Sequence, residues 1–371
     1  MEIQLKGAGQ TPFSRFADGR AVMRSSIREY LCSEAMAALG IPTTRALSVI
    51  ATGERVFRET VEPGAVVARL APCFIRFGHF EYFAHTGQPE KLRELADLVI
   101  AGHFPDVVAG DYAAFFREVC ERTARLMAQW QAVGFSHGVM NTDNMSILGL
   151  TIDYGPFGFM DAYEPMFICN HTDHAGRYAF ARQPSVGLWN CQALAAAMAG
   201  LVDSADLEAG LKAYEPAYQN AALPMMRAKF GLRDSVSDTL IAEALQMMAR
   251  AKADFTQSFR RLSNLDQDDP AFIIADFGAE SASFEDWLKR WQAAAPDYAA
   301  MRKTNPNFVL RNWVAETAIR AVEDTGDLTV IDRIFKCVTN PFEEASGHPD
   351  DMRFAGPPPE ALRGLEVSCS S

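Results

Sequence analysis

One polar segment constrains this chain more than any other part of the sequence. It reads His137-Gly138-Val139-Met140-Asn141-Thr142-Asp143-Asn144-Met145, then Ile147-Leu148 and Leu150-Thr151-Ile152 around Gly149, then Asp153-Tyr154-Gly155. Two short apolar runs around a glycine predict a tight hairpin, which would bring Asn144 and Asp153 together at its open end. Their oxygen atoms suit Mg²⁺, which prefers such ligands together with substrate phosphates.

The order of elements around this segment narrows the fold. Apolar residues from Tyr112 to Trp130 recur at helical spacing between Asp111 and Gly134, so a buried central helix leads into it. Helix, polar loop, hairpin and Asp-Tyr-Gly follow the protein-kinase order H-R-D-x-x-x-x-N and D-F-G.

Aligned on that pattern, His137 takes the first position, Asn144 the metal-binding Asn, and Asp153 the Asp of D-F-G. Val139 occupies the position of the kinase base, and a carboxylate reappears at Asp143. The alternative is a polar loop built from Asx turns, which accounts for short pieces but not for the whole order.

The first 80 residues contain a second pair of candidate site residues, Lys6 and Glu29. Lys6 ends an alternating strand pattern at residues 3–6, and Glu29 follows in a helix that Ser25-Ser26 would cap. The spacing resembles the kinase Lys–Glu pair that orients phosphates. Two alternatives stay open: Glu29 as the N3 residue of a capping box that starts at Ser26, and Lys6 as a solvated strand-end charge.

Two arginines lie in strongly apolar surroundings. Arg69 is the second-to-last residue of a strand predicted at 64–70, which follows another at 46–52. Arg76 comes seven residues after Arg69. An arginine in such surroundings is normally paired or bound to an anion. A structural salt bridge to one of the 47 carboxylates is the alternative to a phosphate site. Asp18-Gly19 is first a turn signal.

Composition excludes several classes of protein. The 371 residues carry a net charge of −12, which disfavours nucleic-acid and anionic-membrane partners. No apolar run reaches the ~18 residues of a membrane span, and the N-terminus shows no signal peptide. Seven irregularly spaced cysteines fit a reducing compartment. We therefore expect a cytoplasmic protein of bacterial type, with a mitochondrial location as the alternative.

Several of these stretches resemble the selenoprotein O (SelO) family, over residues 1 to 371. The motifs that carry the resemblance are Leu5-Lys6-Gly7-Ala8-Gly9-Gln10-Thr11-Pro12, Asp18-Gly19-Arg20-Ala21, Arg24-Ser25-Ser26-Ile27-Arg28-Glu29, the segment His137 to Met145, Asp153-Tyr154-Gly155-Pro156 and Ser368-Cys369-Ser370-Ser371. Some members carry selenocysteine where this chain has Cys369.

The resemblance implies an α+β, protein-kinase-like fold with two lobes, classed as a pseudokinase. We expect a partial small lobe at 1–80 and a mainly helical large lobe at 81–343, with the catalytic loop at 137–144 and Asp-Tyr-Gly at 153–155. A tail with Cys369 would span 344–371. The Gly-rich nucleotide loop of the family precedes its Lys, and only five residues precede Lys6 here. We therefore expect a small lobe that is incomplete at its N-terminus.

The resemblance also implies an activity, protein adenylylation. AMP would pass from ATP, bound in a flipped orientation, to Ser, Thr or Tyr hydroxyls of proteins, with release of pyrophosphate. Lys6, Arg69 and Arg76 would hold phosphates, Asp18-Gly19 would belong to the nucleotide site, and Glu29 would pair with Lys6. Asp143 would accept the proton, and Asn144 and Asp153 would bind Mg²⁺, with Mn²⁺ as an alternative. The sequence does not fix an oligomeric state.

A second hypothesis comes from a different functional class. The chain could be a nucleotide-binding pseudokinase that acts as a redox-responsive scaffold. Cys169 lies sixteen residues after Asp153, in the expected activation segment, and Cys369 lies in the terminal tail. A reversible disulfide between them would restrain that segment. Two unrelated thiols are the alternative.

Overall fold

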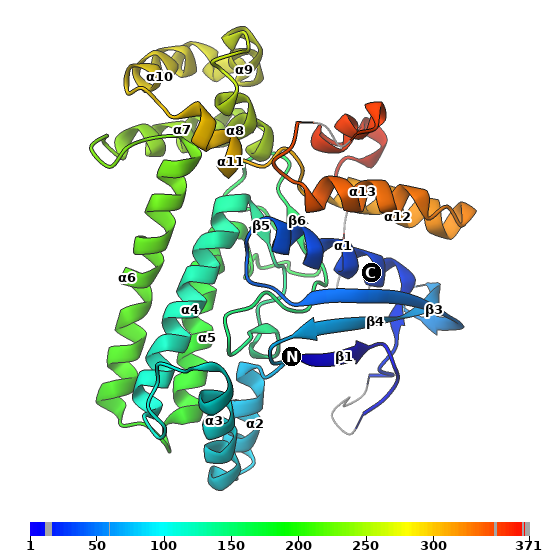
Figure 1. The fold of residues 1–371 in the computed structure, drawn as a ribbon, viewed down its shortest axis with the longest axis vertical. Helices are drawn as coiled ribbons and strands as arrows, with labels where there is room; N and C mark the ends of the chain where they lie inside the picture. Colours follow the sequence, from blue (N-terminus) through cyan, green and yellow to red (C-terminus); the bar gives the residue numbers. More distant parts are fainter. Residues whose placement is uncertain (12–16, 59, 345–346, 366, 368–371) are drawn as a thin grey trace.

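A small antiparallel sheet and a larger helical part make up the fold in a computed structural model, which describes residues 1–11, 17–58, 60–344, 347–365 and 367 (Figure 1). The strands of the sheet are β1 (Glu2–Lys6), β2 (Ala21–Val22), β3 (Arg45–Phe57) and β4 (Val61–Ala71). A separate pair is formed by β5 (Phe135–Ser136) and β6 (Gly158–Phe159). The predicted α+β class is confirmed, since a small sheet accompanies a mainly helical remainder.

The helices account for most of the chain. They are α1 (Met23–Ala38), α2 (Phe77–His85), α3 (Pro89–His103), α4 (Tyr112–Val133), α5 (Gln183–Met198), α6 (Ser204–Lys229), α7 (Thr239–Ala251), α8 (Phe255–Ser263), α9 (Pro270–Asp276), α10 (Ser281–Ala293), α11 (Tyr298–Thr304), α12 (Asn312–Thr325) and α13 (Thr329–Thr339). Short 3₁₀ turns are η1 (Thr142–Asn144), η2 (Phe180–Arg182), η3 (Gly278–Glu280), η4 (Pro349–Ala355) and η5 (Glu360–Leu362). None of the helices in the described part of the chain is long and apolar enough to cross a membrane.

Strand β4 organises the sheet. It pairs with β3 along one edge and with β1 and then β2 along the other, all antiparallel. In this register Gln4 lies opposite Arg69 and Lys6 opposite Val67. Because side chains alternate along a strand, Gln4, Lys6 and Arg69 share the face that α1 covers.

The start of α1 differs from the prediction. The helix begins at Met23, directly after β2, so Ser26 lies inside it and its hydroxyl donates to Val22 O at 2.8 Å. The capping box predicted for Ser26 and Glu29 is therefore wrong, and Glu29 is a buried residue of the second turn. The strand passes into the helix without a connecting loop, which leaves no room for a separate cap.

The central helix forms as predicted. Asp111 caps α4 by accepting from Ala114 N at 2.9 Å, and Gly134 ends the helix in the left-handed conformation, with φ 71°. Phe115, Val119 and Met127 of its apolar stripe are fully buried. The helix thus delivers the chain to β5 and the polar segment.

The hairpin predicted around Gly149 is wrong. A turn is present, because Gly149 N donates to Ser146 O at 3.1 Å. The two arms, however, pair with other segments: Ser146 bridges Arg76, and Thr151 bridges Thr43. The backbone groups of each arm form hydrogen bonds with a segment from the first 80 residues. The polar segment is therefore joined to the segments that flank strands β3 and β4.

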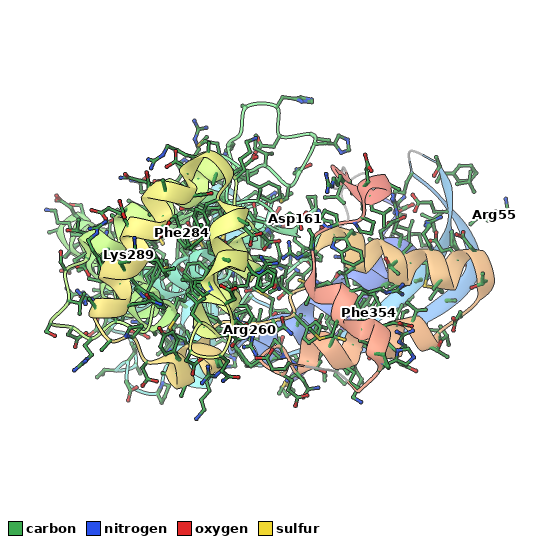
Figure 2. The ribbon with its side chains drawn as sticks, turned by 90° about the horizontal axis from the view of Figure 1, so that it is seen from above. Arg55, Asp161, Arg260, Phe284, Lys289 and Phe354 are labelled. Carbon is green, nitrogen blue, oxygen red and sulfur yellow. The ribbon has the colours of Figure 1, made fainter. Side chains whose placement is uncertain are left out.

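Two apolar cores support this arrangement. The first joins α1 to α2–α5, α12 and α13, so helices near the end of the chain lie against α1 (Figure 1). The second is built from α7–α11 and includes Phe284 of α10; Figure 2 shows this end of the molecule, with Asp161 between it and the α12–α13 side. Arg311 joins the two parts by donating to Asp161 at 2.6 Å and to Asp254 at 2.8 Å.

Candidate active site

Lys6 and Glu29 form the first contact of the site. Lys6 Nζ donates to Glu29 Oε2 at 2.6 Å, so the end of β1 is tied to the second turn of α1. Glu29 is only 1% exposed, whereas the Lys6 side chain is 34% exposed. The lysine therefore reaches out from a buried carboxylate toward solvent.

Arg69 of β4 is the buried centre of the site, with 3% exposure. One guanidinium nitrogen donates to Glu29 Oε1 at 2.9 Å and also contacts the Asp153 carboxylate, while the other contacts the Gln4 amide oxygen. From the sequence, two interpretations of this arginine were possible: a ligand of phosphate, or a partner in a structural salt bridge. Its carboxylate partners are both residues predicted for the same site.

Arg76, which precedes α2, connects two parts of the polar segment. It donates to the carbonyl oxygen of Asp143 at 2.7 Å and contacts the other oxygen of the Asp153 carboxylate. Asp153 is thus held between two arginines, with Lys6 Nζ 3.7 Å away. The described residues bring the predicted phosphate ligands and the predicted metal ligand Asp153 into one cluster.

The electrostatics of this cluster favour an ionised Asp153. Burial by itself would raise the pKa of the carboxyl group, but Arg69, Arg76 and Lys6 together lower it far below its ordinary value. The residue also adopts a left-handed backbone, with φ 61°, which is uncommon outside glycine. Three cations surround two carboxylates, Glu29 and Asp153, so the cluster carries an excess of positive charge.

Asp143 and Asn144 lie in the 3₁₀ turn η1, next to the start of α2. The Asn144 amide nitrogen donates to Val139 O at 3.0 Å, which orients the amide and leaves its oxygen as the atom that can coordinate a cation. Together with the Asp153 carboxylate it makes an all-oxygen donor set, which is the kind that Mg²⁺ takes. The donor chemistry therefore fits the predicted metal.

His137 packs under the polar segment, between Trp130 and Ile152. Its ring stacks on Trp130, with centroids 5.3 Å apart, and its Nε2 donates to Ile152 O at 2.8 Å. Burial lowers the pKa of His137 below its ordinary value, so the ring is neutral at physiological pH. The residue thereby fixes the backbone at Ile152, directly before Asp153.

Asp18 and Gly19 lie apart from this cluster in the contacts of the described residues. Asp18 accepts two hydrogen bonds from Arg58, at 2.9 and 3.0 Å, and one from Arg20 N. The hydrogen bonds from Arg58 lower the pKa of Asp18 to about 2. Gly19 has φ 68°, and a Cβ there would lie 2.1 Å from Gly9 O. The pair shapes the connection between β1 and β2.

Two residues of the site were not predicted from the sequence. Gln4 contacts Arg69 across the sheet, and the signal was its position two residues before Lys6, on the same face of the strand. Gly78 approaches the Asp143 carboxylate so closely that a Cβ would lie 2.2 Å from Oδ1. No local pattern marks Gly78, because the contact depends on how η1 meets α2.

The tail returns to the segment after Asp153. Val367 bridges Asn170, and its carbonyl accepts from His171 N at 3.0 Å. Cys169 is buried beside Ser136, and burial raises the pKa of the thiol to about 12. Cys369 lies outside the described residues, so the disulfide hypothesis stays a prediction.

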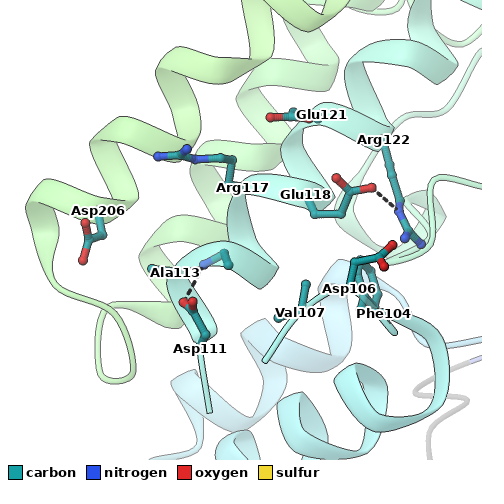
Figure 3. Close-up of a pocket in the computed structure, with 11 residues that line it drawn as sticks. Phe104, Asp106, Val107, Asp111, Ala113, Arg117, Glu118, Glu121, Arg122 and Asp206 are labelled. Atoms are coloured by element: carbon teal, nitrogen blue, oxygen red, sulfur yellow. Dashed lines mark hydrogen bonds and ion pairs between the residues drawn. The ribbon is translucent and has the colours of Figure 1, made fainter. Parts of the chain in front are cut away.

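A cavity of about 480 Å³ lies on the helical part (Figure 3). It is lined by α4, by the connection before it and by Asp206 of α6. Its polar groups serve the helices: Glu118 pairs with Arg122 at 2.8 Å, and Asp111 caps α4. Residues of the Lys6–Asp153 cluster do not line this cavity.

Comparison with known proteins identifies the family of the chain. The family described as "Protein adenylyltransferase SelO" matches residues 1–339. The chain is similar to proteins named "Protein nucleotidyltransferase YdiU" from Myxococcus xanthus (49% identity), Thiobacillus denitrificans (50%) and Vibrio cholerae (48%). Each alignment covers 100% of this chain and 78% of the relative. The chain therefore belongs to the SelO family of protein adenylyltransferases.

Proposed function

We propose that this chain transfers AMP from ATP to Ser, Thr or Tyr hydroxyls of proteins, with Mg²⁺ as its metal, and releases pyrophosphate. The observation that carries the proposal is the cluster in which Lys6, Arg69 and Arg76 surround Asp153 beside Asp143 and Asn144. Its excess of positive charge suits a polyphosphate, and its acidic and amide oxygens suit a divalent cation. Family membership supports the same reaction class.

The roles follow from the chemistry of each side chain. Lys6, Arg69 and Arg76 bind phosphates, and Glu29 and Gln4 orient Lys6 and Arg69 for that purpose. Asn144 and Asp153 hold Mg²⁺, which when bound neutralises charge that develops on phosphate oxygens. The family resemblance assigns Asp18 and Gly19 to the nucleotide site. They would act by shaping the connection between β1 and β2.

The chemical step is a displacement at the α-phosphorus. The acceptor hydroxyl oxygen forms a bond to that phosphorus, the bond to the β-phosphate oxygen breaks, and pyrophosphate leaves. Lys6, Arg69 and Arg76 stabilise the charge on the leaving group, which grows in the transition state. The hydroxyl proton passes to the Asp143 carboxylate, a general base for which the kinase position itself offers only Val139.

The decisive test follows each end of ATP separately. Label from α-³²P-ATP should become attached to protein acceptors in the presence of Mg²⁺, whereas label from γ-³²P-ATP should leave as pyrophosphate. Transfer from γ without transfer from α would make the chain a kinase. Nucleotide binding with no transfer of either label would favour the redox-responsive scaffold, which the pairing of Val367 with Asn170 beside Cys169 keeps as the second candidate.

A further inference from the structure

Gly78 and Asp143 meet at a distance that only a glycine allows. A Cβ built on Gly78 would lie 2.2 Å from Asp143 Oδ1, well inside any contact that carbon and oxygen make. The next nearest atoms are Asp143 Cγ at 3.3 Å and Asp143 Cα at 3.6 Å. The Asp143 carboxylate therefore rests directly on the bare Cα of the first turn of α2.

The backbone fixes this approach from both sides. Phe77 N donates to Met145 O at 3.0 Å, Ile147 N donates to Ile75 O at 3.1 Å, and Arg76 donates to Asp143 O at 2.7 Å. Residues 75–78 and 143–147 thus run alongside each other as a short hydrogen-bonded pair. Phe77 is fully buried, and its packing together with these hydrogen bonds holds the start of α2 against η1.

The backbone of Gly78 does not itself require a glycine. Gly78 lies within α2 and is not among the glycines with positive φ, and alanine is the better helix former. An added methyl group would meet the end of a flexible side chain rather than backbone, so the protein would fold around it. The one group that would have to move is the Asp143 carboxylate.

We propose that Gly78 is a positioning residue for Asp143. The absence of a side chain at Gly78 leaves a space, here called the seat, in which the Asp143 carboxylate is held for proton transfer. The inference rests on the proposed function, in which Asp143 accepts the hydroxyl proton. The seat lies at the N-terminus of α2, where the helix favours a negative charge. Catalytic groups displaced by about 1 Å can lose on the order of a hundredfold in rate.

The test compares two Gly→Ala substitutions in helices. Gly78→Ala should lower kcat for α-³²P transfer at least tenfold, with KM for ATP and Tm not decreased. Gly102→Ala in α3 is the matched control, because a Cβ at Gly102 meets nothing within 4 Å. It should leave kcat unchanged. Wild-type kcat in Gly78→Ala, or a fall in its Tm that accompanies the loss of kcat, would overturn the proposal.

A double-mutant cycle separates this inference from the proposed function. Asp143→Asn alone should lower kcat, and adding Gly78→Ala should then change it little, since both act through one carboxylate. If Asp143→Asn keeps wild-type kcat, the proposed role of Asp143 fails and the seat has no function. If Asp143→Asn loses kcat while Gly78→Ala does not, only the positioning role of Gly78 fails.

Discussion

Arg69 donates directly to the Asp153 carboxylate, so a residue proposed to hold phosphate and a residue proposed to hold metal are bonded to each other. In the proposed function, Mg²⁺ and the phosphates of ATP compete with this contact. Arg76 reinforces the pairing from the other oxygen of the same carboxylate. Both arginines are thus paired with the carboxylate to which Mg²⁺ is proposed to bind, and binding competes with these pairs.

Asp153→Ala should separate nucleotide binding from transfer. Without this carboxylate, Glu29 still pairs with Lys6 and Arg69 while Arg76 loses its pair with Asp153, so affinity for ATP without metal should rise about tenfold, or ~1.4 kcal/mol. Mg²⁺-dependent AMP transfer should be lost. Calorimetry with ATP in EDTA, and label transfer in Mg²⁺, measure the two effects. Weaker metal-free binding by the variant would contradict the competition described here.

Glu29→Gln and Lys6→Met should both lower AMP transfer at least tenfold, but they should differ in stability. Glu29 is buried and accepts from Lys6 and Arg69, so its loss leaves a buried arginine underpaired, at a cost of about 3 kcal/mol. Lys6 is partly exposed, and its removal leaves Glu29 paired with Arg69, at a cost of about 1 kcal/mol. Urea denaturation measures the difference between the two variants. Equal destabilisation would show that the pairing of Glu29 with Arg69 does not dominate the stability of this cluster.

Lys229 should make stability rise with pH. Its ammonium group is buried between Phe255 and Phe259, with the Asn305 amide oxygen 3.0 Å away, and burial lowers its pKa to about 7 from the ordinary 10.5. Between those values the unfolded chain binds more protons than the folded one, so the free energy of unfolding increases with pH. The full effect is on the order of 5 kcal/mol.

Lys229→Met isolates this contribution. The variant should be more stable than the wild type near pH 6.5, and its advantage should shrink as the pH approaches 10. Lys289→Met is the control, since Lys289 of α10 has a 64% exposed side chain (Figure 2). Denaturation curves at several pH values provide the measurement. A constant difference between wild type and Lys229→Met would mean that Lys229 keeps its ordinary pKa.

Mild oxidation should link Cys169 to Cys369 and lower AMP transfer. Val367 already pairs with Asn170, the neighbour of Cys169, so the tail comes to the right segment. The buried thiol should react slowly, because its raised pKa leaves little thiolate. Non-reducing peptide mapping detects the link, and Cys369→Ser is the control. Absence of a linked peptide after prolonged oxidation counts against the switch.

Local patterns predicted the pieces of the site that depend on spacing. The order from α4 to Asp153-Tyr154-Gly155 and the 23-residue separation of Lys6 and Glu29 are properties of the chain itself. The start of α1 was missed because Val22 and Met23 carry no capping signal, while Ser25-Ser26 imitate one. The capture of Asp153 by Arg69 and the seat at Gly78 depend on tertiary approach, which no local pattern encodes.

The packing of α12 and α13 on α1 sets the order in which the protein can mature. Arg28, next to Glu29, donates to the Asn312 side chain 284 residues later, and the helices that begin there cover α1. During synthesis the N-terminal segment emerges long before these partners exist. The surroundings of Arg28 on α1 are therefore completed only after Asn312 has left the ribosome, so this part of the core closes late in synthesis.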